Sequence, residues 1–132
     1  MCSSDLATVI IDFGMVRAAR VTPDVVGRFV AGTPGYIAPE QVLDPLELDQ
    51  RADVYALTGT IYNVMTGRSF FDDAGSLRER IRGHMQRDPF EDPARLRGLP
   101  AGLAKLLRAG AAHAVRDRPT PIEFGREFAR LV

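Results

Sequence analysis

The sequence predicts a mainly α-helical fold with one short β-strand near the N-terminus. Three stretches of the second half place apolar residues three and four positions apart, which is the spacing of one helix face. A fourth stretch, residues 54–67, is uncharged over its whole length. The chain of 132 residues is long enough for one domain with a hydrophobic core, and it shows no internal repeat or domain boundary.

The first third of the chain is expected to hold little regular structure. The β-branched run from Thr8 to Ile11 predicts a short buried strand. From Gly14 to about Gly35 the apolar period is lost, and threonine, proline and glycine accumulate. A loop of this length inside a domain usually has a function or is mobile.

Two helices of different length are expected next. A short one can start at Pro39, because proline suits the first helical turn, and it should end near the Asp44-Pro45 pair. Asp49 can cap a second helix from about Gln50 to Thr66, which stops at Gly67. Because this helix is uncharged on every side, we expect it to be buried all round.

Three amphipathic helices complete the predicted fold, and each carries an apolar stripe with charged residues beside it. The second begins near Pro100, and proline-containing linkers separate the three. We expect the three stripes to pack inward, around the central uncharged helix. The stripes are Leu77, Ile81 and Met85; Leu103, Leu106 and Leu107; and Ile122, Phe124, Phe128 and Leu131.

Composition excludes several classes of function. The 17 basic and 17 acidic residues cancel, which argues against a broad nucleic-acid-binding surface. The single cysteine, Cys2, excludes an internal disulfide framework and fits a reducing compartment. Asp12 interrupts the short apolar patch near the N-terminus, and the uncharged run 54–67 is too short and polar to span a bilayer. We therefore expect a soluble, cytoplasmic chain without a membrane segment.

The order of several short motifs is more informative than any one of them. "DFG" at Asp12 to Gly14 is followed by "GTPGYIAPE" at Gly32 to Glu40, by "DVYALTGTIYNVMTGRSFF" from Asp53, and by "RDRPTP" with Arg118. In this order and at these spacings the motifs resemble the second half of a eukaryotic-like Ser/Thr protein kinase, of the type also found in bacteria. The resemblance runs from about Val9 to Leu131 and implies a truncated kinase C-lobe from the DFG segment onward.

The resemblance assigns the first motif to nucleotide chemistry. Asp12 matches the aspartate that coordinates the Mg²⁺ bridging the phosphates of ATP, and its alternative is a turn aspartate at a strand end. Phe13 and Gly14 open the activation segment, where glycine lets the backbone turn. Thr22 is the candidate phosphorylation site there, although a solvated loop threonine beside Pro23 is the simpler interpretation.

The later motifs are assigned to substrate docking and to architecture. The loop of Gly32, Thr33, Pro34, Gly35 and Tyr36 matches the docking loop for protein substrates, in which Thr33 is alternatively a plain turn residue before Pro34.

Three charged residues are given structural roles. Glu40 and Arg118 match a buried ion pair that ties the activation segment to the last helices. Asp53 matches the aspartate at the head of the central helix, which accepts hydrogen bonds from the catalytic loop, and here it can also serve the helix dipole. Thr58 departs from the family pattern, which usually has glycine at this position inside the helix.

The sequence lacks the other parts of a kinase active site. No G-x-G-x-x-G occurs, and the sole lysine, Lys105, lies in a late helix, far from the expected positions. No H-R-D catalytic loop precedes the DFG triplet. His84 and His113 are interpreted as surface or helix-end histidines. We therefore expect that Mg²⁺ and ATP do not bind this chain alone, because one carboxylate is not enough to hold them.

Three functional hypotheses remain open. The chain can be the C-terminal part of a Ser/Thr kinase whose first half is missing because of a mis-called start, a frameshift or a contig edge. It can be a non-catalytic, pseudokinase-like binding or scaffold module for a kinase or its substrate. It can also be completed in trans by a separately encoded N-lobe. By itself, the chain lacks the segments that cover one side of the central helix in a kinase. The face with Val54, Leu57, Ile61 and Met65 should then form an apolar patch.

Overall fold

The computed structural model describes residues 35–43 and 48–132, and within them the mainly α-helical prediction is confirmed. Five α-helices and two short 3₁₀ helices occupy these residues, and no strand is among them. The predicted strand from Thr8 to Ile11 lies outside the described residues. The elements are α2 (Pro39–Leu43), α3 (Arg51–Thr66), α4 (Leu77–Gln86), η1 (Pro93–Leu96), α5 (Ala101–Gly110), η2 (Val115–Asp117) and α6 (Pro121–Leu131).

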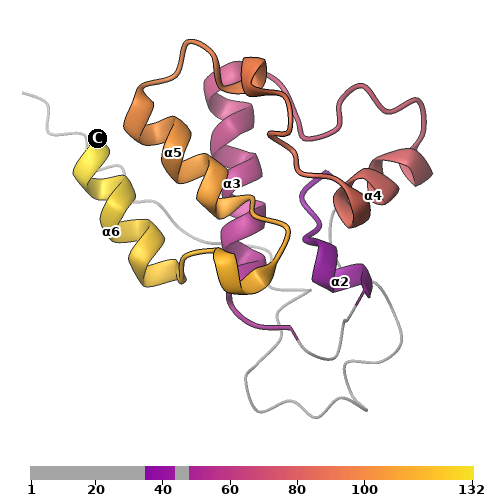
Figure 1. Cartoon of the computed structure of the whole chain (residues 1–132), viewed down its shortest axis with the longest axis horizontal. Helices are drawn as coiled ribbons and strands as arrows, with labels where there is room; N and C mark the ends of the chain where they lie inside the picture. Colours follow the sequence, from indigo (N-terminus) through magenta and orange to yellow (C-terminus); the bar gives the residue numbers. More distant parts are fainter. Residues whose placement is uncertain (1–34, 44–47) are drawn as a thin grey trace, which may run out of the picture.

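Helix α3 stands at the centre, and the other helices lie on two sides of it (Figure 1). Helices α5 and α6 pack against each other and against α3 on one side, whereas α2 and α4 pack together on the other side. The helix begins and ends close to the predicted positions. Asp49 accepts a hydrogen bond from the backbone N–H of Arg51 at 2.6 Å, and Gly67 ends the helix in the left-handed conformation.

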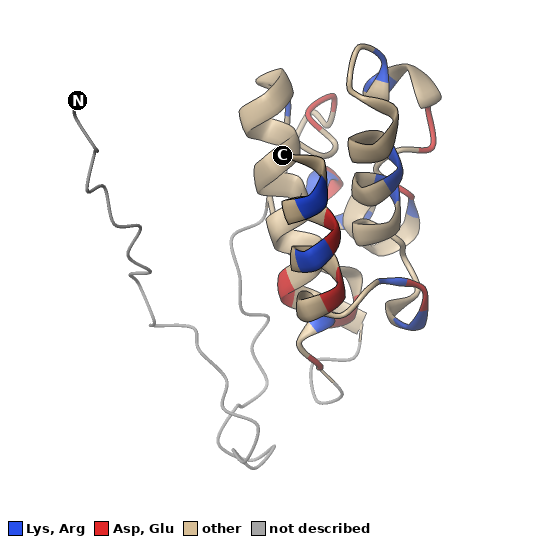
Figure 2. Ribbon diagram, turned by 90° about the vertical axis from the view of Figure 1, so that its left-hand side faces the viewer, with Lys and Arg blue, Asp and Glu red and all other residues tan. Residues whose placement is uncertain are grey.

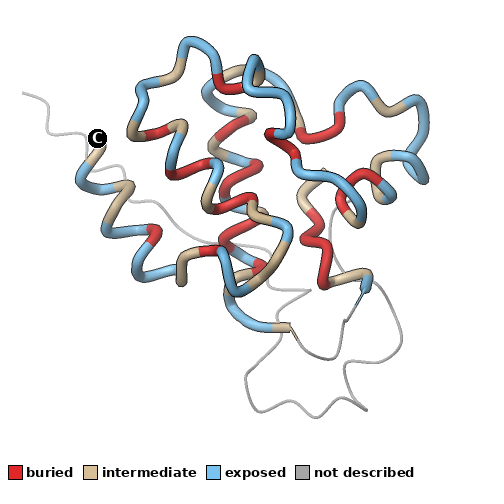
Figure 3. Tube along the Cα trace, in the orientation of Figure 1, coloured by how far each residue is buried: buried red, intermediate tan, exposed pale blue. Residues whose placement is uncertain are grey.

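The prediction that α3 is buried all round is wrong. Val54, Tyr55, Thr58 and Tyr62 are buried, but Leu57, Val64 and Met65 are 47%, 77% and 50% exposed. The cause is that the neighbouring helices cover two sides of α3 and leave the remaining positions exposed. In Figure 3 most of the visible part of α3 is red or tan, and blue appears near its upper end. Of the residues predicted to form an apolar patch, Leu57 and Met65 are exposed, Ile61 is half-buried and Val54 is buried.

The α5–α6 side of α3 depends on a close approach between three helices. Val54 packs with Leu106 and Phe124 in a small apolar cluster. A Cβ atom on Gly110 would lie 2.1 Å from Thr58 Oγ1 and 2.9 Å from the Phe124 ring, so only glycine fits there. Gly110 thus makes room for Thr58, whose hydroxyl donates to the carbonyl of Val54 at 2.7 Å.

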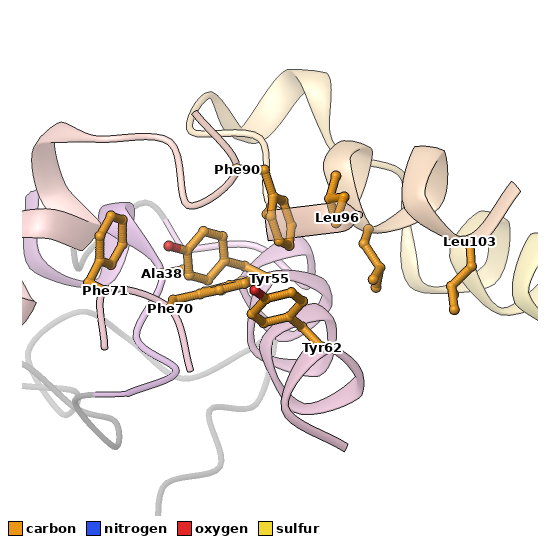
Figure 4. Close-up of a cluster of buried hydrophobic side chains, with 11 residues drawn as sticks. Ala38, Tyr55, Tyr62, Phe70, Phe71, Phe90, Leu96 and Leu103 are labelled. Atoms are coloured by element: carbon orange, nitrogen blue, oxygen red, sulfur yellow. The ribbon is translucent and has the colours of Figure 1, made fainter. Parts of the chain in front are cut away.

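The other side of α3 faces a cluster of aromatic rings (Figure 4). Phe70 contacts Tyr55 and Phe90 edge to face, with ring centroids 5.5 Å and 5.3 Å apart. Tyr62 meets Phe90 at 5.1 Å. These rings join α3 to the segments on either side of α4, and the same cluster continues to Leu103 and Leu107 of α5.

The apolar stripe of α4 does not pack inward, contrary to the prediction. Leu77 is 60% exposed and Ile81 and Met85 are half-buried, while Gly83 and His84 form the buried face. A Cβ atom on Gly83 would lie 2.8 Å from Phe71, so the missing side chain lets the ring reach the helix backbone. The stripe of α6 packs as predicted at Phe124, Phe128 and Leu131, but Ile122 in its first turn is 67% exposed.

Candidate functional site

The predicted functional residues fall into two groups in the structure. Gly35, Tyr36, Glu40, Asp53 and Arg118 belong to the described part. The metal ligand, the rest of the activation segment and the first residues of the docking loop lie outside the described residues: Asp12, Phe13, Gly14, Thr22, Gly32, Thr33 and Pro34.

Arg118 and Glu40 lie together, 78 residues apart in the sequence. The guanidinium of Arg118 donates from Nη1 to Glu40 Oε1 at 2.6 Å and from Nη2 to Oε2 at 2.7 Å. The side chain of Arg118 is fully buried and that of Glu40 is 9% exposed. A two-pronged pair of this kind has the strongest geometry that arginine and carboxylate can adopt.

The remaining donors of Arg118 bind three backbone carbonyls. Its Nε donates to Ala112 O at 2.6 Å, Nη1 to Arg51 O at 3.1 Å and Nη2 to His113 O at 3.2 Å. With the two bonds to Glu40, this uses all five N–H groups of the guanidinium. One side chain therefore joins α2, the first turn of α3, and the loops that flank η2.

Tyr55 and His84 extend this centre toward α4. The Arg118 guanidinium lies over the Tyr55 ring at 5.1 Å, and the Tyr55 hydroxyl is 2.8 Å from His84 Nδ1. Burial raises the pKa of Tyr55 above its ordinary value near 10, and the nearby Arg118 charge only partly offsets this. The prediction that His84 is a surface residue is wrong, because it is fully buried against Phe71, with ring centroids 4.9 Å apart. The helix-end interpretation is confirmed, since His84 lies in the last turn of α4.

His113, the other histidine, is exposed. Its Nε2 lies 2.6 Å from the carbonyl oxygen of Met85, near the end of α4. This contact joins the loop after α5 to the α2–α4 side of the molecule.

The described end of the predicted docking loop rests on α3. Gly35 and Tyr36 form a half-buried turn just before α2. The Tyr36 ring lies against Gly59 of α3, where a Cβ atom would be 3.2 Å from the ring and 3.3 Å from Phe70. Gly59 therefore provides a flat surface on which the turn packs, directly above the aromatic core.

Asp53 and the described acidic residues offer no metal site by themselves. Asp53 is exposed in the first turn of α3, where its charge suits the helix dipole. Within residues 35–43 and 48–132, no three His, Cys, Asp or Glu side chains gather closely enough to hold a metal ion. No helix of the described part is long and apolar enough to cross a membrane.

Sequence reasoning missed Tyr55, His84 and the glycines at helix contacts. Gly83 next to His84 interrupts α4, a helix otherwise made of good helix formers. Because glycine weakens a helix, its presence in the middle of one is a signal that another chain segment approaches closely there. Gly110 at the end of α5 gives the same signal, although its position also suits a helix end.

Comparison with known proteins gives one consistent result. The family model described as "Protein kinase domain" matches residues 1–126. The chain is 32% identical over 134 aligned residues to the serine/threonine-protein kinase PknB of Mycobacterium tuberculosis, covering 99% of this chain and 21% of that protein. It is 34% identical to Pkn1 of Myxococcus xanthus over 83% of this chain and 16% of that protein. It is 30% identical to serine/threonine-protein kinase A of Synechocystis over 86% of this chain and 22% of that protein.

Proposed function

Because this chain belongs to the protein kinase domain family, we propose that it forms part of a Ser/Thr protein kinase that transfers the γ-phosphoryl group of ATP to protein serine or threonine. The three relatives named above are serine/threonine kinases, and the chain spans less than a quarter of the length of each. In this proposal residues 1–132 are the C-lobe part of the kinase domain. The N-lobe and the catalytic loop come from sequence outside them, either upstream in the same protein or from a separate N-lobe partner.

The observation that carries the proposal is the five-bond centre of Arg118. It holds Glu40, at the end of the "GTPGYIAPE" stretch, against the later helices in a buried ion pair. This supports the proposal that the pair ties the activation segment to the last helices. Since Tyr36 packs on α3 a few residues earlier, the same contacts hold the described end of the docking loop. A rigid base under a docking loop is what positioning a substrate hydroxyl requires.

Each predicted site residue has a defined task in this proposal. When bound, Mg²⁺ supplies charge neutralisation at the phosphates, and Asp12 is the residue of this chain that would hold it. Gly32, Thr33 and Pro34, with Gly35 and Tyr36, would hold the substrate segment. A phosphate on Thr22 would order the activation segment.

Without the missing parts, we propose that the chain transfers no phosphate. Its sole lysine, Lys105, lies on α5, late in the sequence, whereas a kinase takes its phosphate-contacting lysines from segments before the DFG triplet. The sequence has no glycine-rich loop to cover those phosphates. The single cysteine also supports a cytoplasmic location for this part of the protein.

The first experiment is to sequence the DNA and the transcript upstream of the Met1 codon, then express the longest frame found. We expect an H-R-D loop and a strand lysine to run into Cys2, and the longer protein to phosphorylate a generic protein substrate. The matched control is Asp12→Asn in the longer protein, which should lose activity while its thermal unfolding stays unchanged. A stop codon upstream, with no activity of residues 1–132 mixed with a separately encoded N-lobe, would contradict the proposal.

A second candidate is a non-catalytic binding or scaffold module, and the exposed strip of α3 favours it. Leu57, Val64 and Met65 are each about half exposed or more, on the central helix of the fold. A protein of 132 residues that folds cooperatively as a monomer and binds a kinase or its substrate would support this candidate. Aggregation relieved by an N-lobe would instead favour the kinase part.

A further inference from the structure

We propose that Phe70, acting across the bare backbone of Gly59, is a positioning residue that fixes the place of Tyr36 and with it the affinity of the docking loop for a protein substrate. The inference rests on the proposed function, because it concerns the loop that would hold the substrate. It adds to that function two residues outside the loop, one in α3 and one in the segment between α3 and α4.

The contact between the three residues is tight. A Cβ atom on Gly59 would lie 3.2 Å from Tyr36 Cδ1, and 3.3 Å and 3.5 Å from Cε2 and Cδ2 of Phe70. Carbon atoms in ordinary contact are about 3.5–4.0 Å apart. The edges of both rings therefore close over the backbone of Gly59, and a methyl group fits there only if one of the rings shifts.

Phe70 is the fixed partner in this contact. Its side chain is 1% exposed. The ring packs edge to face against Tyr55 and Phe90, and its centroid lies 5.8 Å from that of Tyr62. Figure 4 shows Phe70 next to Tyr55 and Tyr62. Because protein interiors are close-packed, a ring enclosed in this way cannot give way without moving its neighbours.

Tyr36 is the partner that can move. It is half-buried in the turn before α2, whereas residues 37–40 behind it are buried, with Glu40 held by Arg118. Gly35 in front of it is open, since a Cβ atom there would meet nothing within 4 Å. Tyr36 is therefore the point at which the described end of the docking loop rests on the remainder of the fold.

The position of this residue matters for substrate binding. A substrate hydroxyl must be placed accurately for phosphoryl transfer, and a misplacement of about 1 Å can cost about a hundredfold in rate. One methyl group on Gly59 would displace a ring by a few tenths of an ångström. We therefore expect a smaller but measurable effect, confined to the protein substrate.

The first test adds that methyl group. Gly59→Ala in the longer protein should raise the KM for a protein substrate about three- to tenfold, because the new Cβ pushes Tyr36 away from the fixed Phe70 ring. The KM for ATP should change by less than about twofold. Alanine favours a helix more than glycine does, so a weakened α3 cannot cause the loss. The matched control is Gly125→Ala in α6, where the added Cβ meets nothing within 4 Å and both KM values should stay the same.

A second change tests whether Phe70 is the cause. Phe70→Leu shortens the side chain beside residue 59, so Gly59→Ala with Phe70→Leu should return the KM for the protein substrate to within about twofold of the unsubstituted value. Phe70→Leu alone should raise this KM, because Tyr36 then loses its support. General losses of stability add up, whereas these two changes should compensate each other. Circular dichroism and thermal unfolding establish that each variant is folded.

Hydrogen exchange measures the placement of the loop without relying on activity. In residues 1–132, Gly59→Ala should speed exchange of the backbone N–H groups of residues 35–37 about threefold or more, and should leave those of α6 unchanged. Adding Phe70→Leu should reverse the effect.

Three results would overturn the inference. They are a KM for the protein substrate that stays unchanged or rises together with that for ATP in Gly59→Ala, no recovery in the double variant, and unchanged exchange at residues 35–37. If the longer protein transfers no phosphate at all, the proposed function fails, and the exchange rates then decide by themselves whether Phe70 positions Tyr36.

Discussion

Helices α4 and α6 look alike in the sequence and pack in opposite ways on the two sides of α3. Each carries an apolar stripe with charged residues beside it, and α6 also shows alternating charges on its outer face (Figure 2). Helix α6 buries its stripe through Phe124, which is 1% exposed. Helix α4 buries Gly83 and His84 instead and leaves Leu77 outside.

The difference shows that an apolar stripe predicts a helix more reliably than it predicts the buried face. On the α6 side, Gly110 of α5 supplies the close approach, so that Phe124 can fill the space. On the α4 side the helix itself carries the glycine, and Phe71 fills the space from outside. In both helices, the buried face is the one on which an aromatic ring packs against the backbone of a glycine. In α6 the helix contributes the ring, and in α4 the helix contributes the glycine.

The largest expected effect comes from Arg118, which lies between the two sides and contacts both. Arg118→Ala should lower the free energy of unfolding by about 3–5 kcal/mol, because it leaves Glu40 buried without a partner. Urea unfolding followed by circular dichroism measures this. The control Arg116→Ala removes an exposed arginine two residues away and should change stability by less than about 0.5 kcal/mol. A loss below about 1 kcal/mol for Arg118→Ala would show that the pair is not a main support of the fold.

Truncating one stripe residue in each helix tests the comparison directly. Phe124→Ala should cost about 3–5 kcal/mol of unfolding free energy, because it leaves a cavity beside Val54 and Leu106. Leu77→Ala should cost less than about 0.5 kcal/mol, since Leu77 is largely exposed. Similar losses in the two variants, measured by urea unfolding, would mean that α4 buries its stripe after all.

Two glycine variants test the same contrast with one added methyl group each. Gly83→Ala should destabilise the protein by about 1–3 kcal/mol, because the new Cβ would lie 2.8 Å from the Phe71 ring. Gly125→Ala in α6 meets nothing within 4 Å and should stabilise the protein by about 0.5–1 kcal/mol, through helix propensity alone. Thermal unfolding should shift in opposite directions for the two variants, and a shift in the same direction would contradict the assignment of the buried faces.

The free energy of unfolding should depend on pH through Tyr55, on the side of α3 that faces α4. Burial raises the pKa of Tyr55 in the folded state, so the unfolded chain loses the phenol proton first as pH rises. The contribution of this pKa shift to the free energy of unfolding is complete below pH 10. Above pH 10 the free energy of unfolding falls by about 1.4 kcal/mol per pH unit, until the pKa of the folded state is reached. Urea unfolding across this range measures the slope. Tyr55→Phe should remove this slope while also losing the contact with His84, and an unchanged slope would assign the titration to another group.

The sequence predicted the helices and the ion pair's partners better than it predicted burial. The start and end of α3 follow from Asp49 and Gly67, because both act within a few residues of their own position. Glu40 and Arg118 were recognised by motif order, and no local pattern links residues 78 positions apart.

The errors concern contacts between elements that are distant in the sequence. Whether Leu57 or Val54 of α3 is exposed depends on where α5 and α6 cross it, and this follows from the fit of Gly110 to Thr58 and Phe124. His84 looked like a surface residue because a polar side chain in a charged helix usually is one. Its burial depends on the Tyr55 hydroxyl, which the sequence pattern does not place near it.

The contact between Arg118 and Glu40 also affects the order in which parts of the protein can fold during synthesis. Because 78 residues separate the two, α2 has no partner for its buried carboxylate until nearly all of the described helices have been synthesised. At about 5–20 residues per second, Glu40 would wait roughly 4 to 16 seconds on the ribosome before Arg118 follows it. During that interval the nascent chain exposes apolar rings such as Phe70 and Phe71, so its yield in a cell should depend on chaperones.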